Sequence, residues 1–352
     1  MLKLPKLLLM LPVAALLAGC QYDVLVPKGW VAAQERDLFV ISTLIMCIVI
    51  VPVLIMAVYF PWKYRASRQD KSDYDPNFEH STKIELVVWG VPIAIIVALG
   101  WFVYEYTHKL DPYRPLPAEV AQGKPVEVEA VSLDWKWLFI YPEYGVASVN
   151  EMVIPANRPI NMKLTSSTVM STFVVPSLSG MIYTMTGMQT KLHIVADHQG
   201  TYPGRAAHYN GPGFTGMTFD TIATDDAGFD AWIAKAKASG KALDTESYMS
   251  LEKPSMRDPV GYYASVEPDL FNRIVNMCVE PGKTCMAETM MQDRMGGGGL
   301  DGIKDKSKLE YDDARGVDGF GNALPTPPAP LAHLLSGGHG AAGEEEGQTH
   351  GE

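Results

Sequence analysis

Cys278 and Cys285 are the side chains with the greatest capacity for chemistry in the C-terminal third of the chain. They flank Pro281-Gly282, and two cysteines so placed can form a disulfide in an oxidising compartment. The methionines of the same region are Met277, Met286, Met290, Met291 and Met295. Thiolates and thioethers are the soft ligands that Cu(I) prefers, but methionine also serves as an adaptable packing residue. We expect the disulfide, with a Cu(I) site as the alternative.

A single imidazole, His208, lies beside Tyr209 in a glycine-rich segment. Protein metal sites combine several ligands, and no second ligand is near His208 in the sequence. We therefore expect His208 and Tyr209 to have a structural role.

Glu85 lies at the start of an apolar run, in the sequence Thr82-Lys-Ile-Glu85. This spacing is typical of a capping box, in which the glutamate at the third helical position bonds back to the backbone amide of the cap. The residues alone predict that Glu85 stabilises a helix terminus.

Cys20 ends a segment with the composition of a bacterial lipoprotein signal. Two lysines precede an apolar run over residues 7–17, and Leu17-Ala-Gly-Cys20 follows. In such signals the leading segment is removed and the cysteine becomes the lipidated first residue. We predict a signal peptide over residues 1–19 and a lipid-bearing, palmitate-modified Cys20.

Two further apolar runs, residues 38–60 and 84–106, predict transmembrane helices, because each has an uncharged centre and roughly the 20 residues that a bilayer core needs. The loop at 61–83 carries five lysines and arginines, which indicates a cytoplasmic location. Residues 20–37 and the chain after 106 are then periplasmic. The predicted location is the bacterial inner membrane, with the chain as a multi-pass lipoprotein.

After residue 106 the sequence divides into four segments of different composition. Residues 107–124 form a proline-rich linker, and residues 125–225 hold short alternating runs such as Val126-Glu-Val-Glu-Ala-Val131, which predict an antiparallel, Greek-key β-sandwich. Residues 226–292 predict a helical extension, and the glycine- and proline-rich residues 293–352 predict a disordered acidic tail. The net charge of −11 indicates no nucleic-acid partner.

Four segments resemble, in order and spacing, subunit II of the haem-copper oxidases. They are Ser132-Leu-Asp-Trp-Lys-Trp-Leu-Phe-Ile-Tyr-Pro142, Asn157-Arg-Pro-Ile160, Val174-Val-Pro-Ser-Leu178 and Gly187-Met-Gln-Thr-Lys191. With the hairpin and the signal, the resemblance covers about residues 20–280. It implies a cupredoxin-like fold for residues 125–225, and it is closest to the copper-free branch, the cytochrome bo-type ubiquinol oxidases.

Copper-bearing members of this family hold a dicopper electron-entry centre in the segment that corresponds to residues 204–217. On that frame, the two cysteines, the glutamate, the two histidines and the methionine correspond to Ala206, Asn210, His208, Phe214, Ser171 and Met217. Only the methionine is retained. A dicopper centre needs bridging thiolates and imidazoles, so we expect these positions to be vacant and the chain to bind no metal.

The resemblance implies a non-redox subunit of a proton-pumping oxidase that oxidises ubiquinol and reduces oxygen to water. Haems and copper are then expected in subunit I, with no cofactor and no catalytic residue in this chain. The implied partners are subunit I, smaller membrane subunits, the lipid bilayer and, through the complex, ubiquinol, but not cytochrome c. The family also places a glutamate at the mouth of a proton path into subunit I, which implies that Glu85 is a proton-entry residue as well as a helix-terminus residue.

The alternative function is a membrane-anchored cupredoxin-like binding or assembly module without an oxidase role, because a fold alone does not specify a function. The discriminating observation is whether the hairpin packs on a haem-bearing subunit. A copper-bearing cytochrome c oxidase subunit is contradicted by Ala206, Asn210 and Phe214.

Overall fold

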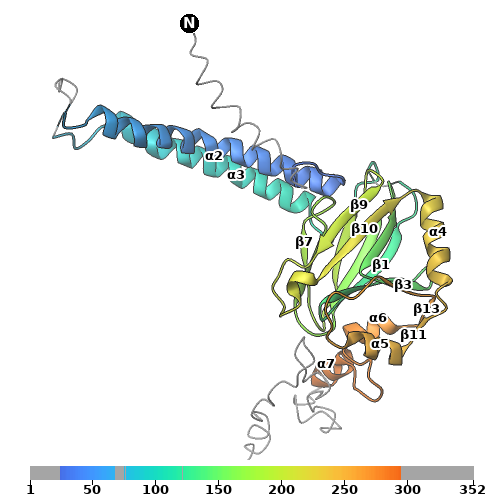
Figure 1. Cartoon of the computed structure of the whole chain (residues 1–352). Coiled ribbons are helices and arrows are strands. Elements are labelled where there is room, and N and C mark those ends of the chain that lie inside the picture. The colour runs from blue at the N-terminus through green and yellow to red at the C-terminus, as the bar shows by residue number, and fades with distance from the viewer. Residues whose placement is uncertain (1–23, 68–74, 76, 121, 295–352) are drawn as a thin grey trace, which may run out of the picture.

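Two long helices form a hairpin that projects from a β-sandwich in the computed structural model, which describes residues 24–67, 75, 77–120 and 122–294 (Figure 1). Helix α2 spans Trp30–Lys63 and helix α3 spans Thr82–Lys109. Both are long and apolar enough to cross a membrane. They extend beyond the predicted apolar runs because helical hydrogen bonding continues into the polar flanks: 34 residues make a helix of about 51 Å, against a bilayer core of about 30 Å.

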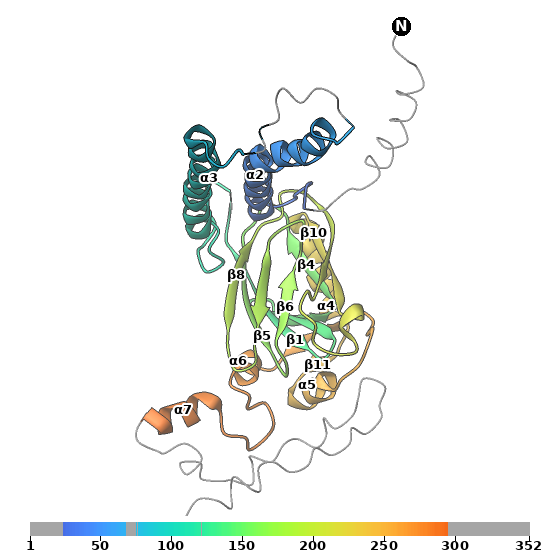
Figure 2. The same ribbon diagram turned by 90° about the vertical axis from the view of Figure 1, so that its left-hand side faces the viewer.

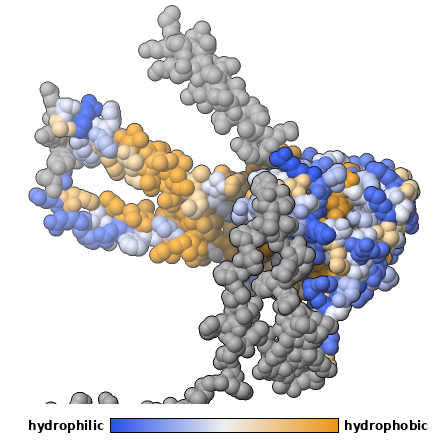
Figure 3. Space-filling view, turned by 60° about the horizontal axis from the view of Figure 1, so that its bottom comes forward, coloured by the Kyte–Doolittle hydropathy of each residue, from blue (hydrophilic) through white to orange (hydrophobic). Residues whose placement is uncertain are grey.

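The hairpin exposes most of its apolar side chains, among them Leu54, Val58, Leu86 and Val97. Figure 3 shows this hydrophobic surface between the hydrophilic loop end of the hairpin and the sandwich. A soluble protein rarely exposes an apolar surface of this extent, so this face requires lipid or another membrane protein.

The sandwich consists of two sheets. The first contains, in spatial order, β12 (Gly261–Tyr263), β3 (Val146–Val149), β2 (Lys136–Tyr141), β1 (Val126–Leu133), β5 (Ile160–Ser166) and β8 (Thr190–Ile194). The second contains β4 (Glu151–Pro155), β10 (Thr218–Thr224), β9 (Gly200–Arg205), β6 (Ser171–Val174) and β7 (Met181–Thr184). The hairpin followed by a β-sandwich confirms the predicted fold class.

The sheets are mixed, whereas the strand pattern predicted antiparallel pairing. Strand β1 pairs parallel with β5, and β10 pairs parallel with β4. The chain leaves the first sheet after β3, passes through β4 in the second sheet and returns as β5 beside β1. This crossover reverses the direction that a simple hairpin would give, and local alternation of residue types does not reveal it.

The core between the sheets is aromatic. The rings of Trp137, Phe139, Phe173 and Phe219 contact one another with centroids 5.1–6.4 Å apart, and all four are buried. Such ring pairs stabilise beyond their buried area. These four rings pack the two sheets against each other.

The C-terminal segment contains α4 (Asp226–Lys237), α5 (Thr245–Glu252), α6 (Leu270–Val275) and α7 (Met286–Arg294). It runs along the sandwich with α4 and then lies at the end of the sandwich that is away from the hairpin, where Figure 2 shows α5, α6 and α7. The expected helical extension also holds strands: β11 (Ala242–Leu243) pairs with β13 (Ser265–Val266), and β12 joins the first sheet at β3. The Trp232 indole on α4 donates a hydrogen bond of 2.9 Å to Glu151 on β4, which ties the extension to the sandwich.

Backbone contacts fix the hairpin to the sandwich. The Lys28 amide donates to the Ser177 carbonyl and the Asp197 amide donates to the Lys28 carbonyl. Gly29 lies so close to the sandwich that a Cβ there would come 2.4 Å from the Val195 carbonyl oxygen. A larger residue at position 29 would force the first turn of α2 away from the sandwich.

Candidate functional site at the 206–217 loop

The loop between β9 and β10 brings three of the predicted positions together with Ser171, the first residue of β6. The Asn210 side-chain amide donates to Ser171 Oγ at 3.3 Å and to Met217 Sδ at 3.2 Å. The Ala206 amide donates to the Met217 carbonyl at 3.1 Å. Pairing of β9 with β6 and with β10 places these residues at one end of the second sheet.

A tryptophan holds this loop in place. The indole nitrogen of Trp135 donates to the Asn210 carbonyl at 3.1 Å. A Cβ added at Gly213 would come 2.4 Å from the Trp135 ring, so only glycine lets the loop pass at this point. The backbone of Asn210 is therefore anchored as well as its side chain.

The chemistry of this cluster does not fit copper. Its side chains offer a hydroxyl, an amide and one thioether, and Ser171 and Met217 are fully buried. No thiolate or imidazole is present to bridge or complete a dicopper centre. Among residues 24–67, 75, 77–120 and 122–294, no group of three His, Cys, Asp or Glu side chains is placed to hold a metal ion.

The two ring side chains among the predicted ligand positions, His208 and Phe214, pack elsewhere. His208 makes an edge contact with Tyr183 on β7, with ring centroids 5.9 Å apart, and Phe214 makes a similar contact with Tyr209 at 5.8 Å. Tyr209 is exposed. The structure thus brings Ser171, Ala206, Asn210 and Met217 into contact by hydrogen bonds, and it gives His208 and Phe214 aromatic partners.

Glu85 lies on the first turns of α3, at the loop end of the hairpin. The predicted capping box is wrong: the N-cap is Ser81 rather than Thr82, and Ser81 makes no side-chain cap hydrogen bond. Glu85 is then the fourth helical residue, one position beyond the glutamate of a capping box. Its carboxylate instead pairs with the imidazole of His80, with Glu85 Oε1 2.6 Å from His80 Nδ1.

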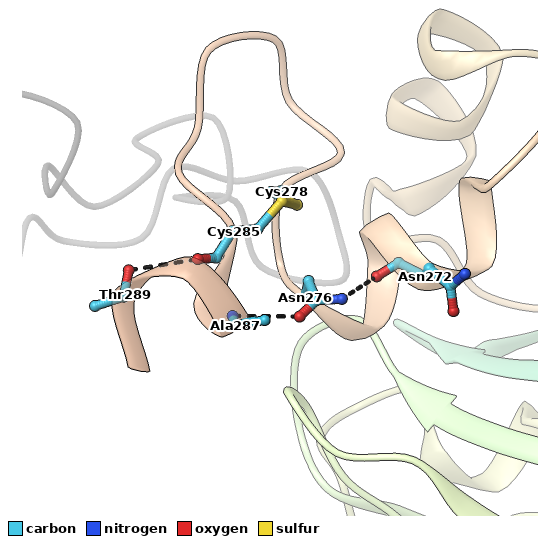
Figure 4. The surroundings of a disulfide bond; sticks show 6 residues. All are labelled: Asn272, Asn276, Cys278, Cys285, Ala287 and Thr289. Atoms are coloured by element: carbon cyan, nitrogen blue, oxygen red, sulfur yellow. Dashed lines mark hydrogen bonds between the residues drawn. A yellow bond between two sulfur atoms is a disulfide. The ribbon is translucent and has the colours of Figure 1, made fainter. Parts of the chain in front are cut away.

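Cys278 and Cys285 are joined by a disulfide (Figure 4). Beside it, the Asn276 carbonyl and side chain accept hydrogen bonds from the Met286 and Ala287 amides, which attaches α7 to the end of α6. The thioethers of Met277 and Met286 pack against Gly187. With the disulfide closed, the two cysteines offer no thiolate for the alternative Cu(I) site.

Cys20, the signal peptide and nearly all of the predicted acidic tail lie outside the described residues. The predictions for these segments stay predictions.

Sequence reasoning missed a buried ion pair. The Lys136 ammonium lies 2.9 Å from Asp258 Oδ2 and donates to the Lys253 carbonyl and to Ser255, while only 2% of its side chain is exposed. Lysine is almost never buried without a partner. The one available signal was the position of Lys136 inside the nearly continuous apolar run at 135–141, all of which is buried.

Two family models match the chain. Residues 145–220 match "Cytochrome C oxidase subunit II, periplasmic domain", and residues 237–282 match "COX Aromatic Rich Motif". The first match covers much of the sandwich and the loop. The second covers the segment that supplies Asp258, the partner of Lys136.

Curated relatives match most of the chain. It is 50% identical over 274 residues to the cytochrome bo(3) ubiquinol oxidase subunit 2 of Pseudomonas putida, covering 77% of this chain and 86% of the relative. It is 49% identical over 262 residues to the ubiquinol oxidase subunit 2 of Acetobacter aceti, covering 74% and 84%. Among solved structures, the periplasmic domain of subunit II of the Bradyrhizobium japonicum cytochrome oxidase is similar, at 24% identity, TM-score 0.32 and coverage of 34% and 98%.

Proposed function

The chain belongs to the ubiquinol oxidase subunit II family of the haem-copper oxidases, and from this premise we propose that it stabilises and caps subunit I without carrying electrons itself. Its relatives bear the name of a ubiquinol oxidase subunit. The oxidase function predicted from the sequence is thereby confirmed, and the alternative of an assembly module without an oxidase role is not favoured.

The hydrogen-bonded cluster of Ser171, Asn210 and Met217 is the observation that carries the non-redox role. In this family a copper relay suits a donor outside the membrane. A lipid-soluble quinol reaches subunit I directly and needs no such relay. In this chain the neutral side chains of Ser171, Asn210 and Met217 bond to one another at the positions that hold copper ligands in copper-bearing relatives. Such a subunit suits an oxidase whose electron donor is quinol, with the haems and the copper in subunit I.

Copper loading tests this role. The detergent-solubilised full-length chain should take up no dicopper centre and show no purple mixed-valence absorption, because the cluster lacks thiolates and imidazoles. The matched control restores the ligands with Ser171→His, Ala206→Cys, His208→Glu, Asn210→Cys and Phe214→His on the retained Met217. Two coppers per wild-type chain with that absorption, or oxygen uptake by the complex with cytochrome c but not with quinol, would contradict the proposal.

We place the hairpin across the bacterial inner membrane, with the loop at 61–83 in the cytoplasm and the sandwich in the periplasm. The five basic residues of that loop and the exposed apolar face of both helices support this topology. That face offers the surface for subunit I, smaller membrane subunits and lipid. Ubiquinol then meets the complex within the bilayer.

We also propose that Cys20 is lipidated, with palmitate among its acyl chains. Mass spectrometry of the mature N-terminus should find a diacylated or triacylated cysteine. The variant Cys20→Ala should retain its signal peptide yet remain in the membrane, because two apolar spans anchor more strongly than lipid chains do. A mature chain that still begins at Met1 would refute lipidation.

Glu85 completes the proposed function as the entry point of a proton path into subunit I. Its carboxylate is at the loop end of the hairpin, the end that the proposed topology places in the cytoplasm, and about half of its side chain is exposed. An exposed carboxylate can exchange protons with water, and the neighbouring imidazole of His80, 2.6 Å away, is itself exposed.

A further inference from the structure

A cavity of about 600 Å³ lies where the hairpin meets the sandwich. Its wall is made by the first turns of α2, the last turns of α3, the linker at 110–117, and residues of β7 and β8. The volume is in the range of sites that hold small molecules. The backbone contacts of Lys28 and Gly29 with the sandwich, described above, fix the hairpin to the sandwich at this junction.

Charged groups of both signs line the cavity without neutralising each other. The cations are Lys109 and Arg114, and the carboxylates are Glu35, Glu105 and Asp111. In the described part of the chain, none of these five forms an ion pair with another. Because these cations and carboxylates do not pair with each other, a ligand that carries both a negative and a positive group can bind to them.

Neutral partners hold the two cations in place. Lys109 Nζ donates to Gln34 Oε1 at 2.6 Å and lies 5.6 Å from the ring centroids of Trp30 and Tyr106. Arg114 Nη1 donates to the His108 carbonyl at 3.2 Å. These contacts orient the cations but leave their charge available, so the geometry is prepared for an anionic group.

The cavity lies at the headgroup level of the outer leaflet if the hairpin spans the membrane as proposed above. The apolar run of α3 ends at Tyr106, and Tyr104 and Trp30 line the cavity. Tyrosine and tryptophan concentrate at this level of a bilayer. The wall also contains the apolar side chains of Val31 and Leu116, which suits an amphipathic ligand that enters from the lipid.

We propose that this cavity binds the headgroup of a zwitterionic phospholipid with a primary ammonium. Lys109 and Arg114 bind its phosphate, and Glu105 binds its ammonium. The three carboxylates outnumber the Lys109 and Arg114 cations, so a purely anionic lipid is disfavoured. The inference rests on the proposed membrane topology but not on the electron-transfer role of the complex.

Native mass spectrometry of the purified complex tests the site. Complexes exchanged into phosphatidylethanolamine should retain lipid. The double variant Lys109→Gln with Arg114→Gln should weaken retention about tenfold or more. A hydrogen bond to a charged group contributes about 1.5–3 kcal/mol, and a tenfold change in affinity corresponds to about 1.4 kcal/mol. The matched control is Lys237→Gln, an exposed lysine on α4, which should leave retention unchanged. Equal retention by the double variant and the wild type would overturn the proposal.

A second variant keeps the proposal testable if the double variant assembles poorly. Glu105→Gln should lower retention of phosphatidylethanolamine relative to anionic phosphatidylglycerol, because it removes the partner of the ammonium. Inorganic phosphate should not displace the lipid, and displacement would assign the cavity to free phosphate instead. A structure of the complex with a segment of another subunit in the cavity would also overturn it. Haem content and quinol-driven oxygen uptake, measured on the same samples, report separately on the proposed function.

Discussion

The variant Glu85→Gln should reduce quinol-driven oxygen uptake by about tenfold or more at unchanged complex yield, if Glu85 is the proton-entry residue. A glutamine keeps the length of the side chain but cannot exchange a proton. Tenfold is a conservative expectation, since a positioned proton-transferring side chain contributes roughly a hundredfold or more. Steady-state oxygen consumption by the purified complex with a soluble quinol measures the effect.

Two matched variants separate proton entry from the local pairing of Glu85 with His80. Glu85→Asp keeps the carboxylate and should restore most of the turnover. His80→Gln removes the imidazole 2.6 Å from the carboxylate while leaving Glu85 intact, and should cost little turnover. If Glu85→Gln turns over like wild type, the proton role fails and Glu85 makes only a local pair with His80 at the start of α3.

The variant Asp258→Asn should lower the free energy of unfolding by about 2–3 kcal/mol. It leaves the Lys136 ammonium buried without its counter-charge, and breaking a fully buried pair costs about 3–5 kcal/mol. The smaller value reflects the 27% exposure of the Asp258 side chain. Chemical denaturation of the purified chain, followed by tryptophan fluorescence, measures the change.

The same pair makes stability depend on pH. Burial opposes ionisation of Asp258, but the hydrogen bonds from Ser255 and Lys136 and the charge of Lys136 outweigh it and hold the pKa of Asp258 below its usual value. A lowered pKa in the folded state means that this stability is present above the unfolded pKa of about 3.9 and is lost as the pH falls through the folded pKa. The wild type should therefore lose more stability on acidification than Asp258→Asn.

The matched control for Asp258→Asn is Glu129→Gln. It breaks the pair of Glu129 with Lys163, in which the charged atoms are 3.8 Å apart and the lysine is 43% exposed. Burial raises the pKa of Glu129 in spite of the charge of Lys163, so this pair is weak. Partly exposed pairs of this kind contribute about 0–1 kcal/mol. Equal effects of Glu129→Gln and Asp258→Asn would contradict a special contribution of the buried pair.

Much of the architecture could be predicted because its signals are local. The runs at 38–60 and 84–106 correspond to α2 and α3, since apolar composition over about 20 residues decides that a segment prefers lipid. Alternation at 126–131 predicted β1 for the same local reason. The parallel pairing of β1 with β5 could not be predicted in this way, because it depends on the crossover through β4 in the other sheet.

Glu85 shows the limit of local motifs. The spacing of Thr82 and Glu85 fits a capping box, but a helix that begins one residue earlier moves Glu85 beyond reach of the cap amide. The choice between Ser81 and Thr82 as N-cap is a matter of backbone conformation, and both residue types are good caps. The same residues therefore allow two helix starts, and the conformation of the chain selects one.

Residue types alone determined that the loop cannot build a dicopper centre, because Ala206, Asn210 and Phe214 supply no thiolate or imidazole in any conformation. Only the tertiary structure decided what fills that space: Asn210 bonds to Ser171 and Met217 because strand pairing brings β6, β9 and β10 together. It likewise decided that Lys136 is buried against Asp258. The type of a side chain determines whether it can bind copper. Burial and pairing depend instead on segments that are distant in sequence and come into contact only in the folded chain.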